Sequence, residues 1–166
     1  MTTGPSDNGW PFGEQDESDP AGAGPFRRVL VGFDASAEAA EALSAAASIA
    51  GRNGGLVVAL AVVPEVPMIE AADDRDSERA ALRRRAEEHF RQARQAAACR
   101  GVQMSLQIVE DRRVARVVCD YADQHGFDLL VLGRHGDGFT LRPRLGRVAE
   151  AAARSSSVPV LLVSVR

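Results

Sequence analysis

The chain has 166 residues, of which 45% are hydrophobic and 26% are charged, and its formal net charge is −3. These values are typical of one globular domain with a buried core and give no reason to expect a nucleic-acid partner. All twenty basic residues are arginine, so the chain offers neither a Schiff-base amine nor the lysine of a P-loop. We find no N-terminal signal peptide and no apolar run long enough to span a membrane, which together predict a cytoplasmic protein.

The first segment differs in composition from the rest of the chain. Residues 1–25 are rich in Gly, Pro and Ser, and residues 1–24 carry five acidic side chains and no basic one. Such a segment cannot bury enough apolar surface to fold, so we predict that 1–25 is a disordered acidic tail. The folded domain is expected over residues 26–166.

The first half of this domain is predicted to contain two strands and two helices. Residues 29–33 form a short apolar run, and an alanine-rich helix follows with Ser36 as its N-cap and Glu38 at its positive end. Residues 56–63 form an unbroken apolar run, as in a parallel strand that is buried on both faces. Apolar residues recur every three or four positions over 74–100, which predicts a long helix.

The second half continues the alternation of strands and helices. Strands are expected over residues 104–109, 128–132 and 158–165, with helices over 114–126 and 147–155. The order β-α-β-α-β-α-β-α-β predicts an α/β fold: a five-stranded parallel sheet with helices on both faces, of the Rossmann-like kind. Five strands and four helices are expected to occupy the whole of 27–166 and to leave no room for a second domain.

A glycine-rich loop follows the fourth predicted strand. It contains Gly133, Gly136 and Gly138, and Gly146 stands where the last helix begins. Glycines let a backbone approach a ligand closely, and a helix N-terminus attracts anions. We therefore expect amides of residues 133–147 to form a concave, electropositive cradle for phosphates. The order G-x-x-G-x-G departs from the dinucleotide fingerprint G-x-G-x-x-G, so a dinucleotide site is disfavoured.

Three separated segments resemble universal stress proteins. "DLLVLGRHGDGFTLRPRLGRVAEAAARSSSVPVLLVSV" contains the nucleotide motif of that family, G-x2-G-x9-G, with Gly133, Gly136 and Gly146 at its glycines. "RRVLVGFDASAEAAEAL" is similar to the first strand and helix of the family, with Asp34 at its characteristic aspartate, and "SSSVPVLLV" is similar to its last strand. The likeness covers about residues 27–166.

The resemblance implies a regulatory stress-response module that binds ATP or another adenine nucleotide, and ATP could bind together with magnesium. It implies that the protein is not an enzyme, although slow ATP hydrolysis could accompany binding. It implies a homodimer joined through the last strand, and an unidentified protein partner. Arg147 stands where ATP-binding members have Ser or Thr, and it could either clamp the phosphates or fill the cleft. The residues that the resemblance places at the nucleotide are Gly32, Phe33, Asp34, Val62, Leu132, Gly133, His135, Gly136, Gly146, Arg147 and Val148.

Two other functions remain open at this stage. The chain could be a nucleotide-free dimeric interaction module whose pocket is closed by Arg147. A related ATP-dependent ligase is weakly supported, because "GFDASAEAA" has one Gly and one Ser where a pyrophosphate loop would be rich in both. Cys99 and Cys119 have neither a CxxC partner nor a nearby cluster of His and Cys, so no metal site is predicted. They are predicted to be small buried hydrophobic residues.

Overall fold

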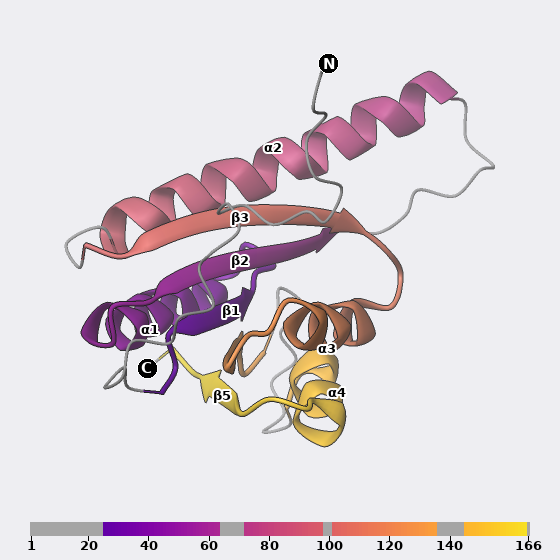
Figure 1. Cartoon of the computed structure of the whole chain (residues 1–166). Helices are drawn as coiled ribbons and strands as arrows, with labels where there is room; N and C mark the ends of the chain where they lie inside the picture. Colours follow the sequence, from indigo (N-terminus) through magenta and orange to yellow (C-terminus); the bar gives the residue numbers. More distant parts are fainter. Residues whose placement is uncertain (1–24, 64–71, 98–100, 136–144, 166) are drawn as a thin grey trace, which may run out of the picture.

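The computed structural model describes residues 25–63, 72–97, 101–135 and 145–165 of the chain, and side chains from residue 76 to 96 within the second helix. In these parts strands and helices alternate as expected (Figure 1). The elements are β1 (Arg28–Gly32), α1 (Ala37–Arg52), β2 (Leu56–Val63), α2 (Ala72–Ala97), β3 (Gln103–Glu110), α3 (Val114–Gln124), β4 (Leu129–Gly133), α4 (Arg147–Ser155) and β5 (Val160–Val163).

The strands form one parallel sheet in the order β3-β2-β1-β4-β5. β1 lies at its centre, where Leu30 pairs with Val58 of β2 on one side and with Leu130 of β4 on the other. The predicted fold class, a five-stranded parallel sheet with helices, is therefore confirmed. Because all strands run the same way, their carboxyl ends meet at one edge of the sheet.

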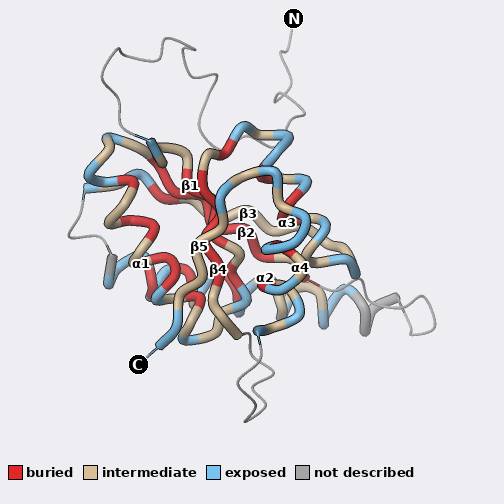
Figure 2. The backbone as a smooth tube through the Cα atoms, turned by 90° about the horizontal axis from the view of Figure 1, so that it is seen from below, coloured by how far each residue is buried: buried red, intermediate tan, exposed pale blue. Residues whose placement is uncertain are grey.

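Each face of the sheet is covered by its own pair of helices, and the side chains of the central strands alternate between the two resulting cores. Val29 and Val31 face α1 and α2, whereas Leu30 faces α3 and α4. The alternation follows from the two-residue period of a strand. Both cores are apolar, and the strands at the centre are almost entirely buried (Figure 2). This explains the unbroken apolar runs in β1, β2 and β4.

The local signals for helix ends and strand ends were mostly accurate. Ser36 caps α1, since its Oγ accepts a 3.1 Å hydrogen bond from the Ala39 amide. Gly126 closes α3 with a φ of 60°, a conformation that glycine adopts without steric cost. The last strand is shorter than the predicted 158–165 at both ends. At its start, the amide of Val158 donates to Ser156 Oγ at 3.2 Å.

The carboxylate of Asp128 joins the amino ends of β1 and β4. Asp128 accepts hydrogen bonds from the amides of Arg27 at 2.8 Å and Arg28 at 3.0 Å, which fixes the start of β1 against the start of β4. The guanidinium of Arg28 donates to the carbonyl of His125 at 2.8 Å. Burial, and secondly the charge of Arg28, lower the pKa of His125. This end of the sheet lies opposite the edge where a ligand is expected.

Cys119 is buried in the core beneath α3, as predicted, and burial raises the pKa of its thiol. Cys99 and residues 1–24 lie outside the described residues. Within the described ranges no helix is long and apolar enough to cross a membrane. The same ranges hold no group of three or more His, Cys, Asp or Glu side chains that could bind a metal ion.

Candidate functional site

The sheet order predicts a ligand crevice between β1 and β4. The chain winds outward from β1 through β2 to β3, and then crosses to β4 and β5 on the other side. In open parallel sheets, ligands bind outside the carboxyl ends of the strands where the winding reverses. Here that point lies beyond Gly32 of β1 and Gly133 of β4. Both residues were predicted site residues, and the fold brings them to neighbouring strand ends.

The loop from β1 to α1 forms one wall of this crevice. Asp34 is exposed, and its Oδ1 accepts a 3.0 Å hydrogen bond from the amide of Ser36. Phe33 is 4% exposed, and its ring meets that of Phe90 edge-on with 6.1 Å between the centroids. The side chain of Phe33 therefore belongs to the core, and its backbone is the part that lies near the crevice. The amide of Phe33 donates to the carbonyl of Leu60 at 2.9 Å.

A histidine from α2 holds the same loop in place. Ala35 has a φ of 63°, in the left-handed region that costs a non-glycine residue about 1 kcal/mol or more. The carbonyl of Ala35 accepts a hydrogen bond from Nδ1–H of His89 at 3.1 Å. His89 is thus a positioning residue for the loop that carries Asp34. Sequence patterns do not indicate this role, because the two residues lie 54 positions apart.

Two of the other predicted residues lie at strand ends with mostly buried side chains. Leu132 is 3% exposed and packs in the core beneath α3 and α4. Val62 is half-buried against the same core, one residue before the end of β2. Backbone groups are therefore what these two positions can present at the crevice. Gly136 lies outside the described residues.

Several amides of the loop after β4 are used within the protein. The amide of Arg134 donates to the carbonyl of Val163 at 2.7 Å, and the amide of Gly146 donates to the carbonyl of Arg134 at 2.9 Å. The amide of His135 donates to Oε2 of Glu38. The expected cradle of amides over 133–147 is wrong at these three positions. An amide already paired in this way cannot also give a phosphate a full hydrogen bond.

The N-terminus of α4 retains the features of an anion site. Gly146 is its N-cap, and among the described residues no side chain caps the helix. The amides of a first helical turn have no partner within the helix and carry its positive dipole end. Arg147 is exposed at the first position, and Val148 is half-buried behind it. Helix ends of this kind attract anions such as phosphate groups.

Glu38 links the two walls of the crevice. It lies in the first turn of α1 and reaches His135, 97 residues further along the chain. Oε2 accepts from the His135 amide, and Oε1 lies 3.2 Å from Nδ1 of the same histidine. The side chains of Glu38 and His135 are 17% and 19% exposed. From the sequence, Glu38 was assigned a place at the positive end of α1 and no contact with the loop.

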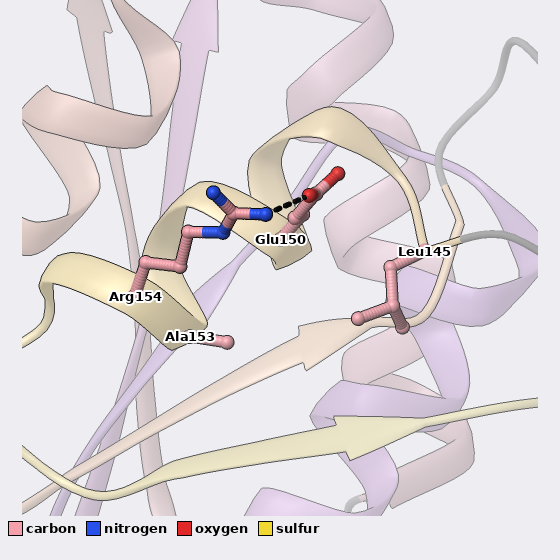
Figure 3. A pocket seen from close by; sticks show the side chains of 4 residues that line it. All are labelled: Leu145, Glu150, Ala153 and Arg154. Atoms are coloured by element: carbon pink, nitrogen blue, oxygen red, sulfur yellow. Dashed lines mark hydrogen bonds and ion pairs between the residues drawn. The ribbon is translucent and has the colours of Figure 1, made fainter.

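A separate hollow opens beside α4. Its volume is about 430 Å³, and its described lining is Leu145, Glu150, Ala153 and Arg154 (Figure 3). Figure 3 shows Arg154 reaching back along the helix to Glu150, which accepts its hydrogen bond at 2.6 Å. The two charges satisfy each other, and the described lining includes none of the predicted site residues. We therefore place the candidate site at the β1–β4 crevice and not in this hollow.

The fold is that of a Rossmann-like α/β protein, a class in which ligands bind at the switch point of the parallel sheet. The model of the universal stress protein family matches residues 25–164. The chain belongs to the universal stress protein family, as its sequence motifs implied. No curated protein matches it significantly.

Solved structures agree with this assignment. The universal stress protein UspA from Lactobacillus plantarum is 25% identical and has a TM-score of 0.74, over 84% of this chain and 99% of that one. A universal stress protein from Archaeoglobus fulgidus in complex with dAMP is 20% identical, with a TM-score of 0.61 over 82% of this chain and 96% of its own. A universal stress protein in complex with cAMP is 22% identical, with a TM-score of 0.59 over 85% and 98%.

Proposed function

We propose that this protein is a regulatory stress-response module that binds an adenine nucleotide in the crevice between β1 and β4. The observation that carries the proposal is the N-terminus of α4, which has no side-chain cap among the described residues and follows a loop with the glycine spacing of the family motif. Two proteins of the same fold were solved with dAMP and with cAMP. The adenine would lie toward β2, near Val62, and the phosphate toward α4.

Arg147 is proposed to bind the phosphate. The residue is exposed, so its guanidinium is not part of the core packing. A guanidinium at the first position of a helix adds a full positive charge where the dipole already attracts an anion. Its exposure favours the phosphate clamp over the alternative in which Arg147 fills the pocket.

We propose a binding role without enzymatic turnover as the main activity. The described residues near the crevice include Asp34, Glu38 and His135, and the carboxylates of the first two already accept backbone amides. Neither is placed as a free general base toward the crevice. If ATP binds with magnesium, the metal would be held chiefly by phosphate oxygens and water, as is usual for Mg²⁺. Hydrolysis of ATP is then expected to be slow.

The direct test is to identify what the protein carries. Protein purified from cells under native conditions is denatured, and the supernatant is separated by chromatography with detection at the adenine absorbance. The proposal predicts an adenine compound in an amount comparable with the protein, or binding of added AMP or ATP in a calorimetric titration. A protein that carries no adenine compound and binds none would support the nucleotide-free interaction module instead.

Replacing Arg147 with serine is expected to weaken binding of a phosphate-bearing ligand about tenfold, since charge-assisted hydrogen bonds contribute about 1.5–3 kcal/mol. Affinity for adenosine should not change. The measurement is a calorimetric titration with AMP and adenosine. Arg154→Ser is the matched control, because it removes the same charge near the other end of α4. Binding gained in Arg147→Ser would instead show that the arginine blocks the pocket.

We also propose a homodimer formed along β5. This strand is an edge of the sheet, and its four residues, Val160–Val163, are all apolar and incompletely buried. Val165 is 47% exposed just beyond it. An unpaired apolar edge strand is prone to aggregation unless a partner covers it. Val165→Glu should therefore shift the protein from dimer to monomer in light scattering, and a wild-type protein that is already monomeric would contradict the proposal.

A further inference from the structure

A cluster of titratable and aromatic side chains lies at the amino end of the sheet, on the edge opposite the proposed nucleotide site. His125 is the C-cap of α3, and its imidazole meets the ring of Tyr121 with 4.2 Å between the centroids. The Tyr121 ring stacks in turn on the ring of Phe127, which is 3% exposed. His125 is therefore half-buried, and one side of its ring packs against aromatic carbon atoms.

A cation is already present beside this histidine. The guanidinium of Arg28 donates to the carbonyl of His125 at 2.8 Å, and its Cζ lies 6.0 Å from the centre of the Phe127 ring. The carbonyl end of a helix attracts a positive charge, and at the end of α3 Arg28 provides it. Protonation of the imidazole would add a second positive charge to the same half-buried cluster, where like charges repel.

The neighbouring acidic groups are held by other partners. Asp128, at the start of β4, accepts from the amide of Arg28 at 3.0 Å and interacts with the charge of the Arg28 side chain. Asp123 is exposed on α3, and its carboxylate accepts from the hydroxyl of Ser157 at 2.9 Å. Burial raises the pKa of Tyr121, so this hydroxyl stays neutral in the range where histidine titrates. The cluster thus favours a neutral imidazole.

We propose that His125 is an acid-sensitive latch between α3 and β1. With a neutral imidazole, Arg28 holds the end of α3 against the start of β1 through the His125 carbonyl. With a protonated imidazole, repulsion between the two cations weakens this contact and the amino end of the sheet opens more readily. The latch does not depend on nucleotide binding, because its residues lie at the edge opposite the candidate site.

The direction of the pH dependence follows from the surroundings of His125. Burial, and secondly the charge of Arg28, lower the pKa of the folded-state imidazole. In the unfolded chain the pKa returns to its ordinary value of about 6.5, so the unfolded state binds the proton more readily. The contribution of His125 to stability is therefore complete above that value. It is lost as the pH falls through the lower pKa of the folded state.

The first test compares urea unfolding of wild type and His125→Gln at about pH 7.5 and about pH 5.5. Glutamine is uncharged at both values and leaves the backbone carbonyl to which Arg28 donates. Between the two pH values, the unfolding equilibrium constant should rise at least about twofold more in wild type than in His125→Gln. Equal changes in the two proteins overturn the proposal.

The second test follows the imidazole itself by nuclear magnetic resonance, with His125 identified by its contacts to the Tyr121 ring. Its titration midpoint in the folded wild type should lie below that of the chain unfolded in urea. Arg28→Gln should raise the midpoint, because it removes the neighbouring charge. Arg116→Gln is the matched control: Arg116 also lies on α3 but is exposed and pairs with Asp120, so the midpoint should stay unchanged.

These titrations decide the matter even if His125→Gln fails to fold. A wild-type midpoint at or above that of the unfolded chain, or equal shifts in Arg28→Gln and Arg116→Gln, overturns the latch.

Amide hydrogen exchange measures the opening directly. The amide of Phe127 donates to the carbonyl of Ala122 at 2.9 Å and so closes the end of α3. Its protection factor should fall at least about twofold from pH 7.5 to about pH 5.5 in wild type, and less in His125→Gln. Protection that does not change with pH in wild type would show that α3 stays attached when His125 is protonated, and the proposal would fail.

Discussion

Gly55→Ala is expected to lower the free energy of unfolding by about 3 kcal/mol. A Cβ atom on Gly55 would lie 2.1 Å from the carbonyl oxygen and 2.6 Å from Cα of Arg27. These are backbone atoms, so no rotamer change can relieve the overlap. The Arg27 backbone is also fixed on two sides, because its amide donates to Asp128 and its carbonyl accepts from the amide of Leu56 at 2.8 Å.

The measurement is equilibrium unfolding in urea at neutral pH, with the slope of the transition monitored to confirm that the folded states are comparable. Gly54→Asn is the matched control. Gly54 has a φ of 64° and nothing within 4 Å of an added Cβ, so it needs a left-handed backbone but not space. Asparagine tolerates that conformation, and a loss below about 1 kcal/mol is expected. Equal losses in the two variants would show that space around Gly55 does not matter.

The fold could be predicted from the sequence because its determinants are local. β2 is buried on both faces, so every residue from 56 to 63 is apolar and both ends of the strand were predicted correctly. The Ser36 cap is likewise a property of four successive residues. β5 was predicted too long, since the apolar run does not show that the amide of Val158 instead donates to the Ser156 hydroxyl before the strand begins.

The position of the candidate site at the carboxyl ends of the strands could be predicted from the sequence. The hydrogen bonds between its residues could not. Strand order brings Gly32 and Gly133 to neighbouring strand ends. The alternating pattern predicted a parallel sheet, whose carboxyl ends share one edge, but it did not predict which strands are neighbours. The pairing of Glu38 with His135 joins residues 97 positions apart and depends on the distance between α1 and β4. Sequence patterns carry no such distances. The same limit explains why the contact between His89 and Ala35 was missed.

Glycines in this chain also show that one residue type can be required for different reasons. Gly133 was interpreted as a position where the backbone approaches a ligand. In the structure its lack of a side chain also lets α1 pack against β4, since an added Cβ would meet Glu38 and the carbonyl oxygen of His135 at 2.9 Å and 3.0 Å. A glycine motif can therefore mark a helix contact at the same place as a binding site.

Gly133→Ala is accordingly expected to lower the free energy of unfolding by about 2 kcal/mol, within the range for overpacking a tight contact. The new methyl group would move the first turn of α1 away from the loop and weaken the hydrogen bond from the His135 amide to Glu38. Urea unfolding measures the loss. If it stays below about 0.5 kcal/mol, the contact between α1 and β4 is looser than the structure has it.

A double-mutant cycle identifies the cause of that loss. Glu38→Gly removes the Cβ atom that the new methyl group would meet, and costs about 1 kcal/mol by itself because glycine is a poor helix residue. If the two atoms clash, the double variant should be more stable than the sum of the single losses predicts, by about 1 kcal/mol or more. Glu38→Ala retains the Cβ and removes the same hydrogen bond, so it should show less coupling than Glu38→Gly. Additive losses with Glu38→Gly would mean that the close approach of the His135 carbonyl oxygen, and not the packing of α1 against β4, requires glycine at position 133.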